Sequence, residues 1–330
     1  MSFKERIYSV GRYLAGKKTA GSVYRLVVEM TNACNLDCNM CPRKHMKREV
    51  EYMDKKIFES ILSENYKTLE FVSLNGFGEP LLHPEFDTFI KMCRQYGVGS
   101  GVSTNCTLLD EKRSALLLEA SPDVITLAID GVGPESYERV RKGAKFDKVM
   151  TNVNRFLHLH SVSKSTSYII LQCIQMTETK DEIEAFKTAF SKYSYDCIRI
   201  RQLTHSGRGR TDDDYSNGEC SCYWLWNEPM ILSNGTMVAC CQDVNGVLPL
   251  GDIRNDSLDA LWKSSKQICT LRNHHSRGER SVIPVCAECN MYQPGIMFAV
   301  GASLLDSRRI NRFIPGIETF LSRLRYRSGE

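Results

Sequence analysis

Three closely spaced cysteines, directly after a strand-like run, constrain this chain more than any other sequence feature. Cys34, Cys38 and Cys41 form a C-x3-C-x2-C pattern, and residues 24–30 make up the preceding run. Three thiolates from one loop can bind three irons of a [4Fe–4S] cluster, whereas ferredoxin-type clusters normally use four cysteines. The pattern therefore predicts a cluster with one open iron, at which a substrate or cofactor binds.

A structural zinc site is the alternative explanation of the same triplet. Such a site would need a fourth cysteine or histidine close by. His45 lies four residues after Cys41 and could supply that ligand. The triplet alone therefore leaves both metals open.

Three further strand-like runs each end in a short polar loop. The loops are residues 76–80 (GFGEP), 103–105 (STN) and 130–131 (DG). In barrels, the loops at the carboxyl ends of the strands bind the ligands. We therefore expect these loops to form one site together with the cysteine loop.

The cysteine loop and the G-x-G-E-P loop, in this order after two successive strands, resemble the radical S-adenosylmethionine (SAM) superfamily. The resemblance covers roughly residues 22–202, with an extension over 220–290. It implies that Cys34, Cys38 and Cys41 hold a [4Fe–4S] cluster whose open iron binds the methionine part of SAM. It also implies that SAM is cleaved reductively to a 5′-deoxyadenosyl radical, which takes a hydrogen atom from a substrate.

The core alternates between strand-like and helical patterns. Helical patterns cover 54–65, 84–96, 145–160, 180–193 and the residues after Asp110, and the last two strand-like runs cover 168–174 and 197–201. Such alternation predicts a parallel sheet with crossover helices, and six β/α units fall short of the eight in a full barrel. The expected fold class is α/β, namely the open, partial (β/α)6 barrel that the resemblance implies, with a small C-terminal α+β extension.

The resemblance also assigns residues to SAM. Glu79 would accept hydrogen bonds from the amine of SAM, since a carboxylate suits an ammonium group. Arg141 would bind the carboxylate of SAM, with Arg139 as its rival, and Cys106 stands where the family often has glycine. Glycines in the loop would let the backbone approach the ligand closely. The expected SAM contacts are Met40, beside the adenine, and Gly76, Phe77, Gly78, Glu79, Ser103, Thr104, Asn105 and Arg141.

A second cysteine-rich region holds seven cysteines within residues 220–289. Residues 233–235 (SNG) lie between two apolar runs and predict a hairpin, and the pattern over 257–271 predicts a helix. The whole pattern resembles the SPASM/twitch extension of radical SAM enzymes, in which four thiolates hold an auxiliary [4Fe–4S] cluster. The ligands that this resemblance implies are Cys222, Cys240, Cys286 and Cys289.

Two alternatives stay open in this region. Cys241 adjoins Cys240 and could replace it as a ligand, and a zinc ribbon could use the same four thiolates. No cysteine follows Cys289, so we expect one auxiliary cluster here and two [4Fe–4S] clusters in the chain.

The composition fits a globular enzyme, with 42% hydrophobic and 25% charged residues. The sequence has no apolar run long enough to span a membrane and no secretory signal at its start. We therefore expect its 14 cysteines to serve metal binding in a reducing cytoplasm rather than disulfides.

Both ends of the chain are basic and show helical apolar spacing. Residues 1–20 and 307–330 each carry a net charge of +4, which leaves −4 for the body of the chain and argues against nucleic-acid binding. One apolar stripe consists of Phe3, Ile7, Val10 and Leu14, and another lies within 313–324. Each helix could lie in a membrane interface or pack on the barrel.

These patterns divide the chain into five parts. They are a basic amphipathic segment (1–21), the radical SAM core (22–204), a linker (205–219), the auxiliary cluster domain (220–292) and a basic helical segment (293–330).

The expected outcome follows from the single auxiliary cluster. A cluster with four protein ligands can accept an electron but cannot bind substrate without losing a ligand. We therefore expect oxidation of a small hydroxyl-bearing substrate, such as a sugar, an aminocyclitol or a lipid-linked relative, with a flavodoxin or ferredoxin as electron donor. Epimerisation and peptide modification are the enzymatic alternatives, and a non-catalytic metal-cluster scaffold is the alternative of another class. No catalytic base is indicated; Cys106 is read as a small core residue, with a hydrogen-atom donor as the alternative.

Overall fold

The strands of the chain form one continuous sheet. The computed structural model describes residues 3–176, 178–203, 221–287, 289, 299–300, 304 and 307. Within these residues, nine strands are joined in the order β6-β5-β4-β3-β2-β1-β7-β8-β9. They are β1 Arg25–Val28, β2 Phe71–Ser73, β3 Gly99–Thr104, β4 Val124–Ala128, β5 Tyr168–Gln175, β6 Cys197–Gln202, β7 Met230–Ile231, β8 Thr236–Val238 and β9 Pro249–Asp252.

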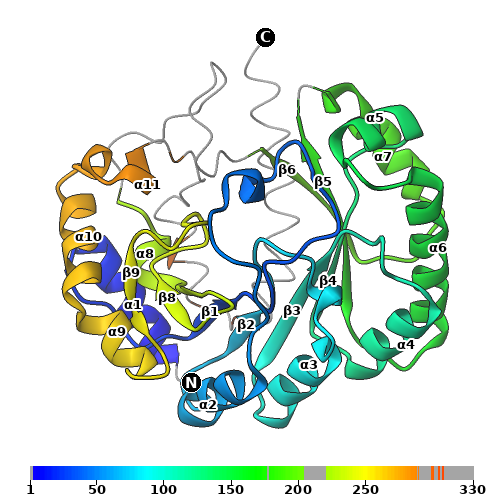
Figure 1. Cartoon of the computed structure of the whole chain (residues 1–330). Helices are drawn as coiled ribbons and strands as arrows, with labels where there is room; N and C mark the ends of the chain where they lie inside the picture. The colour runs from blue at the N-terminus through cyan, green and yellow to red at the C-terminus, as the bar shows by residue number, and fades with distance from the viewer. Residues whose placement is uncertain are drawn as a thin grey trace.

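Strands β1 to β6 are parallel and alternate with helices, which confirms the predicted partial (β/α)6 barrel. Figure 1 shows the sheet curving, with α2, α3, α4 and α6 on its outer side. The helices of this part are α2 Lys55–Asn65, α3 Phe86–Gln95, α4 Glu111–Ala120, α5 Pro134–Val140, α6 Phe146–Val162 and α7 Ile183–Phe190, with 3-10 turns η1 Pro42–His45, η2 Pro80–Leu82 and η3 Lys180–Glu182.

The two faces of the barrel sheet are packed separately, because alternate residues of a strand point to opposite sides. Residues such as Leu26 and Leu127 join the main hydrophobic core under the helices. On the opposite face, Phe71, Val124 and Ile170 form a cluster of their own. Phe71 has room there because Gly101 lacks a Cβ, which would lie 2.9 Å from the Phe71 ring. Apolar side chains therefore fill the barrel at the height of this cluster. The polar loops lie at the carboxyl ends of the strands.

The C-terminal extension continues the same sheet. β7 pairs in parallel with β1, and β8 and β9 follow in antiparallel pairs. The predicted hairpin over 230–239 is confirmed, with Gly235 at φ +87° in its turn. The helices of this part are α8 Trp224–Asn227, α9 Leu258–Ser264, α10 Lys266–Ser276 and α11 Pro284–Ala287, with the 3-10 turn η4 Arg280–Val282.

Two expected helices differ from the observed ones. The pattern over 257–271 predicts one helix, but the structure has α9 and α10 separated at Ser265. Ser265 is extended (ψ 146°) and its hydroxyl accepts a hydrogen bond from the Ile268 N–H, so it caps α10 instead of continuing α9. The helix expected to start at Pro84 begins at Phe86, because Glu85 before it has a non-helical backbone.

Of the predicted apolar stripe on the N-terminal helix α1 (Phe3–Leu14), only Val10 is buried. Phe3, Ile7 and Leu14 are 40–51% exposed. The buried side instead carries Arg6, Ser9, Val10 and Tyr13. The reason is long-range pairing: Arg6 forms an ion pair with Glu70 before β2, and the Tyr13 ring packs edge-on against Tyr223 and Trp226 of the extension.

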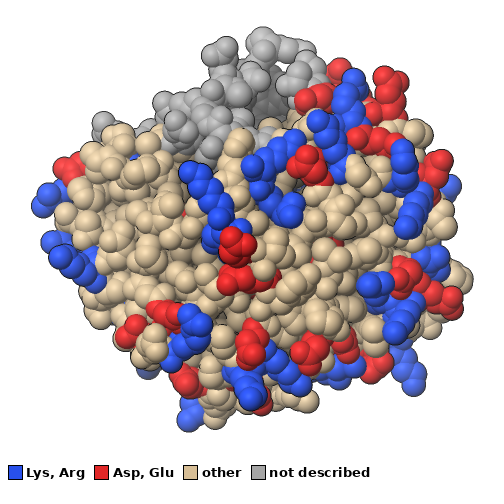
Figure 2. All heavy atoms as spheres, viewed as in Figure 1, with Lys and Arg blue, Asp and Glu red and all other residues tan. Residues whose placement is uncertain are grey.

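The structure describes the N-terminal basic segment from residue 3 onward, but only a few residues of the C-terminal one. Residues 205–219, expected as a linker, and nearly all of 293–330 lie outside the described residues. None of the helices in the described ranges is long and apolar enough to cross a membrane. Figure 2 shows Lys and Arg intermixed with Asp and Glu over the visible face of the molecule.

Candidate functional site

The cysteine triplet lies in the loop between β1 and η1, at the carboxyl end of the first strand. Cys38 is buried, and Cys34 and Cys41 are half-buried. Burial raises the pKa of the Cys38 thiol, Arg141 lowers it and the nearby thiols of Cys41 and Cys34 raise it, with a net value of about 11. The thiols of Cys34 and Cys41 lie close enough to Cys38 to shift its pKa. A metal centre binds thiolates, so the three cysteines can act as ligands of one such centre.

Two other segments hold this loop from either side. The N–H groups of Asp37 and Asn39 donate to the carbonyls of Lys142 and Val140, each at 2.9 Å, and the Glu79 N–H donates to the Ala33 carbonyl at 2.8 Å. These bonds use the backbone only, so the cysteine side chains remain available as ligands.

The two glycines of the 76–80 loop make room for the protein's own chain. A Cβ on Gly78 would lie 2.2 Å from the Thr31 carbonyl oxygen, and one on Gly76 would lie 2.5 Å from Cγ of Glu29. The sequence analysis predicts that these glycines let the backbone approach a ligand closely. The structure shows that they let the loop pack onto the end of β1 and the cysteine loop.

Glu79 joins the predicted residues into one group. Its buried carboxylate accepts hydrogen bonds from the Thr104 hydroxyl (2.7 Å), the Asn105 N–H (2.8 Å) and the Leu81 N–H (3.3 Å). Burial raises the pKa of Glu79, and these bonds act against that rise. An ionised carboxylate has about four acceptor sites, so one is left for an ammonium group.

Asn105 extends this group to the triplet. Its side-chain amide donates to Asn35 Oδ1 at 3.1 Å and lies 3.9 Å from the Cys34 sulfur. Ser103 is half-buried, and its N–H donates to Asn75 Oδ1 at 2.7 Å. The structure therefore brings Glu79, Thr104 and Asn105 together next to the cysteine loop.

Arg141 is buried beside the triplet, whereas its rival Arg139 is exposed. The Arg141 Nε and Nη2 atoms donate to Asp130 Oδ2 at 2.8 and 2.6 Å. Asp130 is fully buried, and its other oxygen accepts from the Ile174 N–H at 2.7 Å. The sequence analysis does not predict that Asp130 orients Arg141, although it identifies the Asp-Gly pair after β4 as a loop of the site.

Three further residues near this site are apolar or strained. Met40 is buried in the main core, and Phe77 packs against Met230, Leu232 and Val238 of the extension. Cys106 is fully buried at φ +64°, in the left-handed region that favours glycine. A glycine, which the resemblance leads us to expect at this position, would adopt this angle without strain.

A second group of cysteines lines one cavity in the extension. Cys222, Cys240, Cys286 and Cys289 all line it, together with Cys241 and His275. Burial raises the pKa of Cys240, and the nearby thiols of Cys241, Cys222 and Cys286 raise it further. The structure thus brings all four predicted auxiliary ligands to one place.

His275 supplies an independent sign that this cavity fits a cluster. Its Nδ1 faces the Cys222 N–H at 3.3 Å, and burial lowers its pKa to about 4, so the ring is neutral. Because Nδ1 accepts that bond, Nε2 carries the ring proton, and it has no partner among the described residues. Cluster and thiolate sulfurs accept hydrogen bonds, so a bound cluster could satisfy this orphaned donor.

The side chains do not by themselves complete a metal site. In the part of the chain that is described, no three His, Cys, Asp or Glu side chains are arranged to hold a metal ion as they stand. The ligands of each cluster are therefore proposed from the family resemblance and from the grouping of the cysteines.

Comparison with protein families agrees with these two sites. A family model described as the radical SAM superfamily matches residues 28–186. A second model, SPASM, described as an iron–sulfur cluster-binding domain, matches residues 220–290.

Individual relatives differ in how much of the chain they share. The tungsten-containing aldehyde ferredoxin oxidoreductase cofactor-modifying protein of Pyrococcus furiosus is 35% identical over 107 residues, 32% of this chain and 30% of that protein. The SAM-dependent 2-deoxy-scyllo-inosamine dehydrogenase of Niallia circulans is 24% identical over 272 residues, 80% of this chain and 91% of that protein. The chain thus spans under a third of the first relative and most of the second.

A solved structure agrees in fold. The crystal structure of BtrN in complex with AdoMet and 2-DOIA superposes with a TM-score of 0.57 at 19% identity, covering 81% of this chain and 93% of BtrN. At this identity the likeness concerns the fold alone.

Proposed function

Because the chain belongs to the radical SAM superfamily and carries a C-terminal SPASM iron–sulfur domain, we propose that it oxidises a small hydroxyl-bearing substrate to a carbonyl compound. The observation that carries this proposal is the similarity over 91% of the length of the Niallia circulans dehydrogenase. That enzyme's name gives an aminocyclitol as its substrate, and we propose a sugar or aminocyclitol for this chain.

The residues divide the work between two clusters. Cys34, Cys38 and Cys41 would hold the SAM-binding cluster, and the four cysteines of the extension the auxiliary one. When bound, SAM and these clusters supply a 5′-deoxyadenosyl radical and an electron acceptor. Glu79 would orient the SAM amine and Arg141, fixed by Asp130, the carboxylate. A reduced flavodoxin or ferredoxin would be the electron source.

The balance of the reaction gives the test. A secondary alcohol loses two hydrogens. One would go as an atom to the 5′-deoxyadenosyl radical, giving 5′-deoxyadenosine, and the other leaves as a proton, while the remaining electron of the substrate radical would go to the auxiliary cluster as acceptor. We expect one SAM consumed per substrate, with a product two hydrogens lighter in mass spectrometry. The assay uses anaerobically reconstituted protein, dithionite, SAM and a panel of aminocyclitols and sugars.

Two other outcomes have distinct signatures. An isomeric product that gains one solvent deuterium would indicate epimerisation and reject the oxidation. A reconstituted protein that forms no 5′-deoxyadenosine under any condition would favour the non-catalytic scaffold.

A peripheral membrane contact is the second proposal, and the exposed face of α1 supports it. Phe3, Ile7 and Leu14 are exposed, and Lys4, Lys17 and Lys18 beside them are exposed as well. Each lysine near an anionic membrane contributes roughly 1 kcal/mol, which salt screens. Arg6 does not add to this, since Glu70 pairs with it.

We expect the protein to sediment with anionic vesicles at low salt and to lose this binding when Phe3, Ile7 and Leu14 are all changed to Ser. Removal of residues 1–20 is a poorer test, because the Lys17 carbonyl accepts a hydrogen bond from Trp226 and Val10 is buried. Intact protein that stays in the supernatant at every salt concentration would reject the membrane contact.

A further inference from the structure

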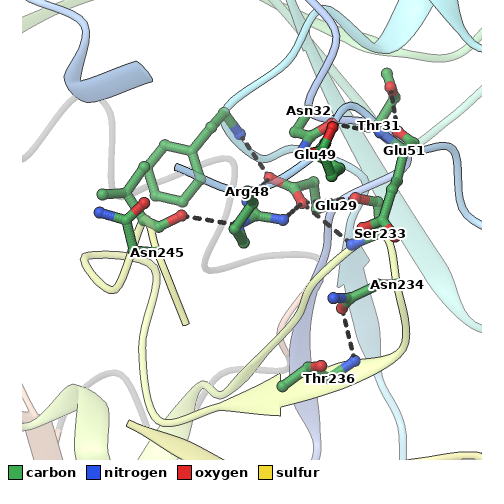
Figure 3. Close-up of polar contacts among 12 residues, drawn as sticks. Glu29, Thr31, Asn32, Arg48, Glu49, Glu51, Ser233, Asn234, Thr236 and Asn245 are labelled. Carbon is green, nitrogen blue, oxygen red and sulfur yellow. Dashed lines mark hydrogen bonds and ion pairs between the residues drawn. The ribbon is translucent and has the colours of Figure 1, made fainter. Parts of the chain in front are cut away.

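A fully buried carboxylate stands where three functional segments meet. Glu29 directly follows β1, and its exposed fraction is 0%. Figure 3 shows its side chain between Arg48 and Ser233. One carboxylate oxygen accepts from Arg48 Nη2 (2.9 Å) and the Phe77 N–H (3.3 Å). The other accepts from Arg48 Nη1 (2.9 Å) and from the N–H (3.1 Å) and hydroxyl (3.0 Å) of Ser233.

The donors come from distant parts of the chain. Phe77 belongs to the 76–80 loop, which carries Glu79. Ser233 belongs to the turn of the β7–β8 hairpin, whose second strand leads into Cys240. Arg48 follows the cysteine triplet, and its Nε donates to the Val244 carbonyl at 2.8 Å. Glu29 therefore ties the SAM-binding loop to the segment that carries an auxiliary ligand.

The packing around Glu29 makes this arrangement sensitive to small changes. Its Cγ occupies the space that a Cβ on Gly76 would need, at 2.5 Å. A buried ion pair adds little stability over apolar packing, but a two-pronged Arg–carboxylate contact has a strict geometry. The network therefore matters less for stability than for how the 76–80 loop lies relative to the β7–β8 hairpin.

We propose that Glu29 is a positioning residue that sets the 76–80 loop against the auxiliary hairpin and so fixes the SAM pocket. This inference rests on the proposed function, because it takes the 76–80 loop as the SAM-binding loop. Glu29 itself touches neither cysteine group, so its effect passes through Phe77 and Ser233.

Glu29→Gln tests the proposal with a change of one atom. Either orientation of the amide points its NH2 at existing donors, on the side of Phe77 or on the side of Ser233. We expect the dissociation constant for SAM, measured by equilibrium dialysis on the reconstituted holoenzyme, to rise about tenfold. Iron content should stay at the wild-type value, and higher SAM should restore 5′-deoxyadenosine formation, so that KM changes more than kcat.

Glu70→Gln is the matched control. Glu70 is also a carboxylate with little exposure, its side chain being 9% exposed, and it pairs with Arg6 and with the Ser307 N–H and hydroxyl. It lies before β2, away from the SAM-binding loop. We expect it to lower the melting temperature about as much as Glu29→Gln, with SAM affinity changed less than about twofold.

The possible results separate clearly. A Glu29→Gln protein that is destabilised like the control but binds SAM as the wild type does would overturn the proposal. If Glu29→Gln does not fold, Arg48→Lys keeps the charge and loses the two-pronged contact, and unchanged SAM affinity in that variant would overturn it equally. Wild-type protein that neither binds nor cleaves SAM would instead reject the proposed function.

Discussion

Replacing Cys34, Cys38 and Cys41 together by alanine is expected to abolish 5′-deoxyadenosine formation and to lower the iron content from about eight to about four per chain. The physical reason is that these thiolates are the proposed ligands of the cluster with the open iron. The loop itself should persist, because its bonds to Lys142, Val140 and Glu79 use backbone groups. Anaerobic iron analysis and chromatographic detection of 5′-deoxyadenosine measure both effects.

Cys93→Ala provides the control for this experiment. Cys93 is fully buried in α3 and has no proposed ligand role, so the change should cost roughly 1 kcal/mol of stability and leave both clusters in place. A triple variant that still cleaves SAM would show that the SAM site has been assigned to the wrong cysteines. Loss of all eight irons would show that the two clusters do not assemble independently.

The sequence predicts which loop residues lie together at the core site, because its signals are local. Each strand-like run ends directly before the residues that matter, so parallel strands place them at one edge of the sheet. The contacts of Glu79 with Thr104 and Asn105 follow from this arrangement. Cys106 is an exception, because its φ of +64° favours glycine and gives no reason for a cysteine at this position.

The remaining features depend on pairings between distant residues, which periodicity does not encode. The spacing of Phe3, Ile7, Val10 and Leu14 leaves a membrane interface and packing on the barrel both open. It gives no sign that Arg6 is buried, where Glu70, far along the chain, pairs with it. The parallel pairing of β7 with β1 likewise has no local signal. Asp130 is visible in the sequence as a loop residue, but its contact with Arg141 appears only in the fold.

The choice between Cys240 and Cys241 shows how the structure narrows an alternative that the sequence leaves open. Both residues line the same cavity. The Cys241 side chain packs against the apolar cluster of Met230, Leu232 and Val238. Burial raises the pKa of Cys241 to about 11, and Cys289 is the one thiol among the groups that shift it. The pKa of Cys240 is raised by burial and by three thiols, those of Cys241, Cys222 and Cys286. We therefore favour Cys240 as the ligand.

Cys240→Ala is accordingly expected to lower the iron content from about eight to about four per chain, and Cys241→Ala to leave it near eight. Both residues follow β8 and differ by one position, so each variant is the matched control of the other. In the Cys240→Ala protein, SAM should still be cleaved to 5′-deoxyadenosine, because the core triplet is untouched, but oxidised product should fall to the limit of detection. The reverse pattern of iron content would make Cys241 the ligand. Equal and complete retention in both variants would mean that either thiol can complete the site, since each lies in reach of the same cavity. Zinc in the extension of the wild-type protein, with only about four irons per chain, would reject an iron–sulfur cluster there, because the same four thiolates can form a zinc ribbon.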